Sequence, residues 1–419
     1  MASSRRGPWS HHRPSGLATL LFIVASIGVL SACWPRATRP SGAPSTPLQT
    51  SHTIYLTGQH GSVDALQSRN GSLRWHKQID KEWSRTTSLV VFGDVLYVGR
   101  VTCPPDCQTS SPLIGSIDAL KVSDGTVLWH AKVDVHNDAS LSVQVMKVVK
   151  GVVYVGVDGG FSGDSAGEVY ALQATNGSLL WHYTVKGECC RGLVVTDTTV
   201  YVGDTDRDRG GSYVDALKTS DGTVLWHHQI DRPSILLGIV AANGVVYVGT
   251  ATADQSGSGI HKGAVDALRA NDGTLLWHNQ TNFPALVLTV ADGIVYVGAL
   301  FDSPLDALRA SDGSLLWQYK GDLQVNQATV MDGVVFLTYE STGYKDIGSK
   351  VDALRISDGS LLWRYTIDPQ DEALQVAVGD GMVYVYVSTL HGIVALDANR
   401  GNQRWFHAAH NVFALAVGP

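Results

Sequence analysis

Two adjacent cysteines, Cys189 and Cys190, are the clearest candidates for redox chemistry in the sequence. Two further cysteines, Cys103 and Cys107, stand close together earlier in the chain. Adjacent α-carbons lie about 3.8 Å apart, which is below the usual range for a disulfide, so a bridge between neighbours is strained. Four thiols allow three pairings, and pairing within each local pair needs the smallest excursion of the loops. The simpler interpretation is that one or both pairs brace surface loops.

Three aspartates at alternate positions, Asp204, Asp206 and Asp208, resemble an acidic loop that binds Ca²⁺. The match is imperfect, because Gly210 falls at position seven of the loop instead of six and arginines alternate with the carboxylates. This departure favours a solvated loop with internal salt bridges. A metal site is the alternative interpretation.

Five histidines directly follow a tryptophan, which would suit metal or proton chemistry if their side chains converged. Alternation along a strand turns each histidine away from its tryptophan, on the outermost strand of its own unit and far from the others. We interpret them as edge residues that discourage pairing between sheets. They are His76, His130, His182, His227 and His278. The sequence contains no nucleophile-elbow, phosphate-loop, HExxH or CxxC motif.

These side chains must be positioned by a unit that recurs eight times from residue 53 onward. In each unit an alanine is followed six residues later by a glycine and four residues after that by a tryptophan, as in Ala267, Gly273 and Trp277. Successive repeat tryptophans are 40 to 54 residues apart, a length that suits a blade of four strands. A buried tryptophan removes about 150–250 Å² from water, so these residues are predicted to hold neighbouring blades together. They are Trp75, Trp129, Trp181, Trp226, Trp277, Trp317, Trp363 and Trp405.

Each unit shows the alternation of β-strands, with Asn-Gly or Asp-Gly at its tight turns. The first unit lacks an innermost strand, and the chain ends with one at residues 411–417. This last strand is therefore predicted to pair with the first blade and close the ring. The sequence predicts an all-β fold, an eight-bladed β-propeller of four-stranded antiparallel blades over residues 53–419.

The long, variable connections of such a propeller share one face, because neighbouring strands run in opposite directions. They are predicted to begin at the glycines that end the second strands, as in Gly99–Ser116 and Gly203–Tyr213. Function is expected on this face. The candidate ligand site at the mouth of the central channel comprises Trp83, Arg85, Asn137, Asp138, Cys189, Cys190, Arg191, Asn282, Asn326, Gln327, Asp371, Glu372 and His410. Trp83 could stack on a planar ligand, although a packed aromatic that plugs the channel is the simpler interpretation.

Alanine, glycine and tryptophan at positions one, seven and eleven of the unit resemble the tryptophan-docking motif of the pyrroloquinoline quinone (PQQ) β-propeller superfamily. This resemblance covers the whole repeat region. It implies either a calcium- and quinone-dependent alcohol dehydrogenase or an eight-bladed lipoprotein without a cofactor, such as the propeller subunit of the outer-membrane β-barrel assembly machinery. In the dehydrogenases an adjacent-cysteine disulfide lies beside the cofactor at the start of an innermost strand, and Cys189-Cys190 has a similar position. The aspartate usual at position three is present only as Asp397, a departure that concerns packing of the outer blade.

The N-terminal residues are predicted to direct export. A polar stretch with arginines precedes an apolar run, Gly16–Ala32, that is short for a stable membrane span. Leu30-Ser31-Ala32-Cys33 resembles the lipobox of bacterial lipoproteins, which implies a signal peptide at 1–32 and lipid on Cys33. An ordinary secretory signal or an uncleaved anchor is the alternative. Residues 33–52, rich in proline, are predicted to form an extended tether.

The chain of 419 residues has a formal net charge of −7 at pH 7, which disfavours nucleic-acid binding through a basic surface. We expect a non-catalytic, membrane-anchored propeller in the cell envelope that binds a protein or polymer partner through its loop face and sheet edges, without a cofactor. The first alternative is a PQQ- and Ca²⁺-dependent alcohol or sugar dehydrogenase that uses the channel mouth. The second, which rests on the resemblance alone, is a lipoprotein of outer-membrane β-barrel assembly.

Overall fold

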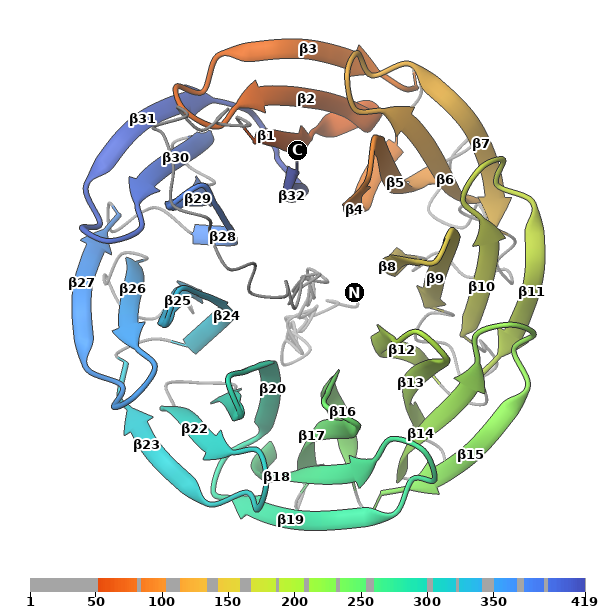
Figure 1. The fold of residues 1–419 in the computed structure, drawn as a ribbon, viewed down its shortest axis with the longest axis vertical. Helices are drawn as coiled ribbons and strands as arrows, with labels where there is room; N and C mark the ends of the chain where they lie inside the picture. The colour runs from red at the N-terminus through yellow and green to blue at the C-terminus, as the bar shows by residue number, and fades with distance from the viewer. Residues whose placement is uncertain are drawn as a thin grey trace, which may run out of the picture.

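The computed structural model describes residues 52–80, 84–102, 114–133, 142–158, 167–185, 188–206, 211–230, 234–253, 260–299, 304–321, 324–340, 350–367, 373–387 and 391–418. These residues form eight four-stranded antiparallel sheets in a ring, which confirms the predicted eight-bladed propeller (Figure 1). The predicted signal peptide, Cys33 and the tether up to residue 51 lie outside the described residues. Within the described ranges, no helix is long and apolar enough to cross a membrane.

In each blade the four strands follow one another in order from the channel outward, and the outermost strand forms the rim of the disc (Figure 1). Blade 1 contains β32 (Ala414–Gly418), β1 (Thr53–Thr57), β2 (Ser62–Gln67) and β3 (Leu73–Gln78), and blade 2 contains β4 (Ser84–Phe92), β5 (Val95–Thr102), β6 (Ile114–Lys121) and β7 (Val127–Val133). Blade 3 contains β8 (Ser142–Val149), β9 (Val152–Asp158), β10 (Glu168–Gln173) and β11 (Leu179–Thr184), and blade 4 contains β12 (Glu188–Val195), β13 (Thr199–Asp206), β14 (Gly211–Lys218) and β15 (Val224–Gln229). A short 3-10 turn, η1 (Gln59–Gly61), joins β1 to β2.

Blades 5 to 8 repeat this order. Blade 5 contains β16 (Ile235–Ala242), β17 (Val245–Ala253), β18 (Ile260–Arg269) and β19 (Leu275–Thr281), and blade 6 contains β20 (Ala285–Ala291), β21 (Ile294–Ala299), β22 (Leu305–Arg309) and β23 (Leu315–Tyr319). Blade 7 contains β24 (Gln324–Met331), β25 (Val334–Glu340), β26 (Lys350–Arg355) and β27 (Leu361–Thr366), and blade 8 contains β28 (Ala373–Gly379), β29 (Met382–Val387), β30 (Gly392–Asp397) and β31 (Gln403–Ala408).

The ring is closed by the pairing of β32 with β1, as predicted. Thr53 lies opposite Gly418 and Thr57 opposite Ala414, so both ends of the propeller chain belong to blade 1. The backbone N–H of Phe413 also donates to the carbonyl oxygen of Thr57, at 2.9 Å. Closure removes two open sheet edges from the middle of the molecule.

Each repeat tryptophan packs between its own blade and the next. The Trp277 indole N–H donates to the carbonyl oxygen of Ala310 in blade 6, at 3.0 Å, and its ring lies 5.8 Å from the ring of Tyr247 in its own blade. A Cβ on Gly313 of blade 6 would lie 2.6 Å from Trp277 Cε3, so only glycine lets the turn approach the indole this closely. All eight repeat tryptophans make the equivalent hydrogen bond to a carbonyl oxygen of the next blade.

One prediction about the loops is wrong. The connection expected at Gly99–Ser116 starts later and ends earlier, because β5 continues to Thr102 and β6 begins at Ile114. Gly99 does not break the strand: a Cβ there would lie 2.8 Å from Val143 Cγ1 of the next blade, so this glycine permits close packing. The same holds in blade 4, where β13 passes Gly203 and ends at Asp206.

Candidate functional site

The predicted channel-mouth residues that the structure describes lie at the start of innermost strands or in the connections before them. Five of the candidates, Trp83, Asn137, Asp138, Asp371 and Glu372, lie outside the described residues. The others are Arg85 in β4, Cys189, Cys190 and Arg191 in β12, Asn326 and Gln327 in β24, Asn282 just before β20 and His410 just before β32. The innermost strands surround the centre of the ring, so these positions share one end of the channel (Figure 1).

The strand that carries the cysteine pair contains an enlarged β-bulge. Cys189 lies opposite Asp204 and Gly192 opposite Gly203, so two residues, Cys190 and Arg191, have no partner on β13. The other irregular innermost strands skip a single residue. A bulge bends its strand and redirects side chains, and bulges are frequent beside functional sites. The local cysteine pairing stays a prediction, since Cys103 and Cys107 lie outside the described ranges.

Two other mouth candidates, Arg85 and Gln327, are partly or fully buried within the protein. Burial lowers the pKa of the Arg85 guanidinium from its ordinary value. Gln327 Nε2 donates to the carbonyl oxygen of Val376, and Gln327 Oε1 accepts from the Val376 backbone N–H, each at 3.0 Å. Because Val376 lies in β28, Gln327 joins the innermost strands of two blades and uses both of its polar groups to do so. Asn282 and His410 are exposed.

The candidate calcium ligands are strand residues as far as the structure describes them. Asp204 is only 3% exposed and lies opposite Tyr213 of β14, Asp206 ends β13, and Asp208 lies outside the described residues. Within the described part of the chain, no group of three or more histidine, cysteine or acidic residues could hold a metal ion. The calcium site therefore stays a prediction.

The five histidines after the repeat tryptophans have acidic partners that the sequence analysis missed. His278 Nδ1 lies 2.5 Å from Asp266 Oδ1 within blade 5, and an equivalent pair occurs within each of blades 1 to 4, with Glu168 in place of the aspartate in blade 3. In blades 6 and 7, Gln318 and Arg364 replace the histidine. Most of these acids are nearly buried, and burial removes water as a hydrogen-bond partner of the carboxylate. The histidine, glutamine or arginine on the rim strand is exposed and supplies that partner instead. The available signal was the spacing between the two partners, which is 12 residues in four blades and 14 residues for Glu168 and His182.

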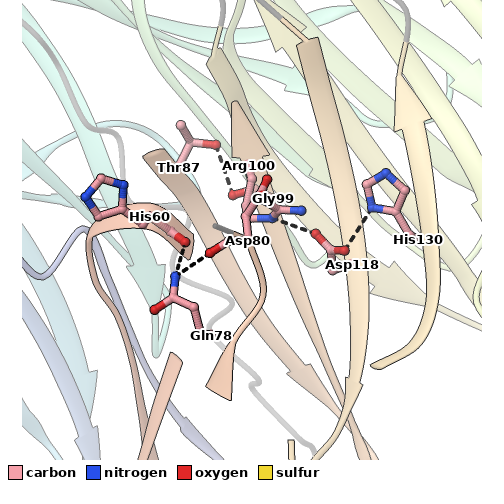
Figure 2. Close-up of polar contacts among 8 residues, drawn as sticks. All are labelled: His60, Gln78, Asp80, Thr87, Gly99, Arg100, Asp118 and His130. Atoms are coloured by element: carbon pink, nitrogen blue, oxygen red, sulfur yellow. Dashed lines mark hydrogen bonds and ion pairs between the residues drawn. The ribbon is translucent and has the colours of Figure 1, made fainter. Parts of the chain in front are cut away.

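A buried ion network joins blade 1 to blade 2, and it too was missed (Figure 2). Arg100 of β5 is 3% exposed. Its Nε donates to Asp118 Oδ2 at 2.7 Å and its guanidinium donates to Asp80 Oδ2 at 3.1 Å, while Asp118 Oδ1 lies 2.9 Å from His130 Nδ1. Asp80 follows the rim strand of blade 1, so the network crosses the interface between the blades. Other blades carry Val157, Thr250 or Ala299 at this position, a difference that comparison of the repeats would have revealed.

Three buried hydroxyl groups belong to the same cluster. Thr86 and Ser116 lie opposite Arg100 on the two flanking strands, so their side chains share its face of the sheet. Ser84 precedes Thr86 by two residues and lies close to Gly61. None of the three hydroxyls has a hydrogen-bond partner among the described residues. Buried groups of this kind are typical sites of internal water, so the cluster is a polar contact between blades that water can complete.

In blade 7, two tyrosine hydroxyls are hydrogen-bonded to the buried repeat acid. Asp352 is fully buried and accepts from the hydroxyls of Tyr319 and Tyr339, each at 2.8 Å, and from Arg364 Nε at 2.6 Å. Burial and the negative charge of Asp352 raise the pKa of Tyr319 to about 12, and the same causes raise that of Tyr339 further. Both phenols therefore stay protonated at neutral pH and act as donors to a structural carboxylate rather than as bases.

A family model described as outer membrane protein assembly factor BamB matches residues 114–282 and 210–416. The chain belongs to this family of PQQ-type propellers. BamB from Moraxella catarrhalis has the same fold, with a TM-score of 0.53 at 16% identity over 82% of this chain and 88% of that one.

Curated relatives of the propeller include alcohol dehydrogenases and outer membrane protein assembly factors. Quinohemoprotein alcohol dehydrogenase ADH-IIG of Pseudomonas putida is 26% identical over 271 residues, which cover 61% of this chain and 35% of that protein. Outer membrane protein assembly factor BamB of Yersinia pestis is 26% identical over 194 residues, which cover 43% of this chain and 46% of that protein. The match thus spans less than half the length of each of these two relatives.

The PQQ and Ca²⁺ pair that the dehydrogenase resemblance implies needs several oxygen ligands at the channel mouth. In this PQQ-type propeller, β16 begins with Ile235 and Leu236 and β20 with Ala285 and Leu286, none of which carries a side-chain oxygen, and the amide of Asn282 lies just before β20. Gln327 has both polar groups engaged by Val376. The described residues by themselves form no cluster of acidic ligands for a calcium ion, and we derive no catalytic step through one.

Proposed function

We propose that this protein is a non-catalytic scaffold on the extracytoplasmic side of the membrane, anchored by lipid at Cys33, which holds a protein partner at the rim of its propeller. The observation that carries the proposal is a belt of exposed aliphatic side chains on the rim strands. With the exception of Phe92, every large hydrophobic residue that is exposed in the described part of the chain lies on a rim strand.

The aliphatic belt consists of two consecutive residues at or near the start of the rim strand in blades 2 to 7, each residue 37–54% exposed. Its members are Val127, Leu128, Leu179, Leu180, Val224, Leu225, Leu275, Leu276, Leu315, Leu316, Leu361 and Leu362. Blade 1 retains only Leu73, and blade 8 has Gln403 and Arg404 instead. Exposed apolar surface that recurs in this way is typical of a surface that binds a partner.

The proposed occupant is an extended segment of a protein partner. Each rim strand is the last strand of its sheet, so one of its edges carries unpaired backbone N–H and C=O groups. A partner strand that pairs with this edge satisfies those groups and places its own side chains against the aliphatic pair. Support for a specific partner comes from the family description, which favours a protein of outer-membrane β-barrel assembly.

The test compares proteins that co-purify from the cell envelope with the wild-type chain and two variants. Leu225→Lys combined with Leu276→Lys charges the belt in two neighbouring blades. Phe92→Lys is the matched control, because Phe92 is 43% exposed and lies outside the belt. We expect a partner that is retained by the control and lost from the belt variant. Capture of the same proteins by all three forms would overturn the proposal.

A second candidate, a PQQ- and Ca²⁺-dependent dehydrogenase, is favoured by the two-residue bulge that holds Cys190 and Arg191 at the channel end of β12. Titration with PQQ, with and without Ca²⁺, followed by tryptophan fluorescence and by dye-linked alcohol oxidation, distinguishes the two functions. Saturable, calcium-dependent binding with turnover would replace the scaffold by the enzyme. Under the scaffold proposal we expect neither binding nor turnover.

A further inference from the structure

Two exposed histidines face each other where the last blade meets the first. The ring centroids of His391 and His410 lie 4.9 Å apart, and the ring planes are inclined at 43°. Both side chains are exposed. Neither residue belongs to the acid-paired histidines of the rim, and His391 was not singled out by the sequence pattern.

The two residues are held together by the backbone. His391 directly precedes β30, and His410 lies in the connection from β31 to the closing strand β32. The N–H of Ala409 donates to the carbonyl oxygen of His391 at 2.7 Å, which ties one connection to the other. His391 has a φ of 48° and Asn411 a φ of 52°, so both connections turn through the left-handed region at this point.

We propose that His391 and His410 form a two-histidine site for a transition-metal dication, Zn²⁺ or Cu²⁺, with water as the remaining ligands. A metal lies about 2.0–2.1 Å from an imidazole nitrogen and therefore about 3.2 Å from the ring centre. Two rings that bind one ion at angles between a right angle and the tetrahedral angle then have centres about 4.5–5.2 Å apart. The observed separation of 4.9 Å lies inside this range.

Exposure and ligand type favour the same class of ion. Imidazole suits Zn²⁺ and Cu²⁺, whereas Ca²⁺ and Mg²⁺ prefer oxygen ligands. No third histidine, cysteine or acidic residue completes a metal cluster in the described ranges, so solvent must fill the remaining positions. Because both imidazoles are exposed, water reaches this site freely.

A bound ion would act on ring closure. His410 lies four residues before β32, the strand that pairs with β1 and closes the propeller, and His391 belongs to the blade before it. An ion shared by both side chains cross-links the final connection to blade 8. Since the unfolded chain does not hold the two imidazoles together, the ion stabilises the closed ring by binding the native state alone. This inference is independent of the proposed function at the rim.

The test is calorimetric titration of the isolated protein, purified without a polyhistidine tag, with ZnCl₂ and then with CuCl₂ at pH 7.5. We compare wild type with His391→Ala, His410→Ala and the double variant. His407→Ala is the matched control, because His407 lies on β31 of the same blade, three residues from His410. Each variant must first match the wild-type circular dichroism spectrum and melting temperature in EDTA, which separates loss of a ligand from loss of the fold.

We expect the wild type and the control to bind Zn²⁺, with Cu²⁺ tighter as the Irving–Williams order requires. Each single variant should bind at least about 10-fold more weakly, since even outer-shell changes cost 10- to 100-fold in metal affinity. Zn²⁺ should raise the melting temperature of the wild type and the control but not that of the double variant. Absence of Zn²⁺ binding in the wild type, undiminished binding in the double variant, or an equal loss in His407→Ala would overturn the proposal.

Discussion

Replacing Gly273 by alanine tests how the turns of one blade lock the tryptophan of the blade before it. Gly273 has a φ of +71°, and a Cβ at this position would lie 2.7 Å from Cε3 and 2.9 Å from Cδ2 of Trp226. The indole of Trp226 also donates to the carbonyl oxygen of Ala270 at 3.0 Å. An added methyl group must therefore displace a ring that is fixed on two sides.

The expected cost has two parts. A non-glycine residue in the left-handed region costs about 1–2 kcal/mol. Forcing an extra carbon into a packed site costs about 1–3 kcal/mol more, partly through strain on the Trp226 hydrogen bond. We therefore expect Gly273→Ala to lower the free energy of unfolding by about 2–5 kcal/mol.

Gly244 provides a matched control in the same blade. It also lies in a turn that joins two strands of the blade, its φ is +77°, and a Cβ there would meet nothing within 4 Å. Gly244→Ala should therefore show only the backbone cost of about 1–2 kcal/mol. Urea unfolding followed by tryptophan fluorescence measures both variants on one scale. Equal destabilisation by the two substitutions would refute the idea that the turn glycine is required by the neighbouring indole.

Three further predictions concern the buried and turn carboxylates. Arg100→Met leaves Asp118 buried without its guanidinium and should cost about 3–5 kcal/mol in urea unfolding; a cost below about 1 kcal/mol would contradict the buried network. Burial raises the pKa of Asp306, so its contribution to stability falls as pH rises through the folded value. Asp306→Asn should therefore gain stability over wild type at pH 8 and lose that advantage near pH 4, as melting curves at both pH values would show. Hydrogen bonds from Thr223 lower the pKa of the exposed Asp221, so its stabilisation is complete above about pH 4 and is lost as the pH falls further. Asp221→Asn should make the melting temperature depend less on pH between pH 2 and 4. Near pH 6 the slope of melting temperature against pH should be the same in the variant and the wild type.

The fold was predictable because the residues that make the contacts between blades recur at fixed positions in each repeat. Every unit has a turn glycine and a tryptophan, and in the structure the glycine lies against the tryptophan of the blade before it, as Gly273 does against Trp226. Closure by β32 followed from counting strands at the two ends of the chain. These features depend on local turn chemistry and on one contact between neighbours, both of which a repeat preserves.

The polar pairs were missed for a different reason. Asp118 and His130 lie directly opposite each other on β6 and β7, but the ladder shifts between Ala119 and Leu120. Strand alternation indicates which face a residue occupies, whereas the partner across the strand depends on this irregularity. Arg100 was assigned to a loop because Gly99 was taken as a strand end, although the glycine serves close packing instead.

One buried position differs in charge from blade to blade. The site of Arg100 in blade 2 is occupied by Asp204 in blade 4 and by Tyr339 in blade 7, and all three are buried in the same part of their blade. Where Arg100 supplies a positive charge to the repeat acid, Tyr339 supplies a hydroxyl. In blade 4, Asp204 and Asp215 are both buried; burial, followed by the charges of Asp215 and Asp204, raises the pKa of Tyr183, whose hydroxyl donates to Asp215. In blades 2 and 7 the residue at this position therefore satisfies the buried repeat acid, whereas in blade 4 it adds a second buried carboxylate.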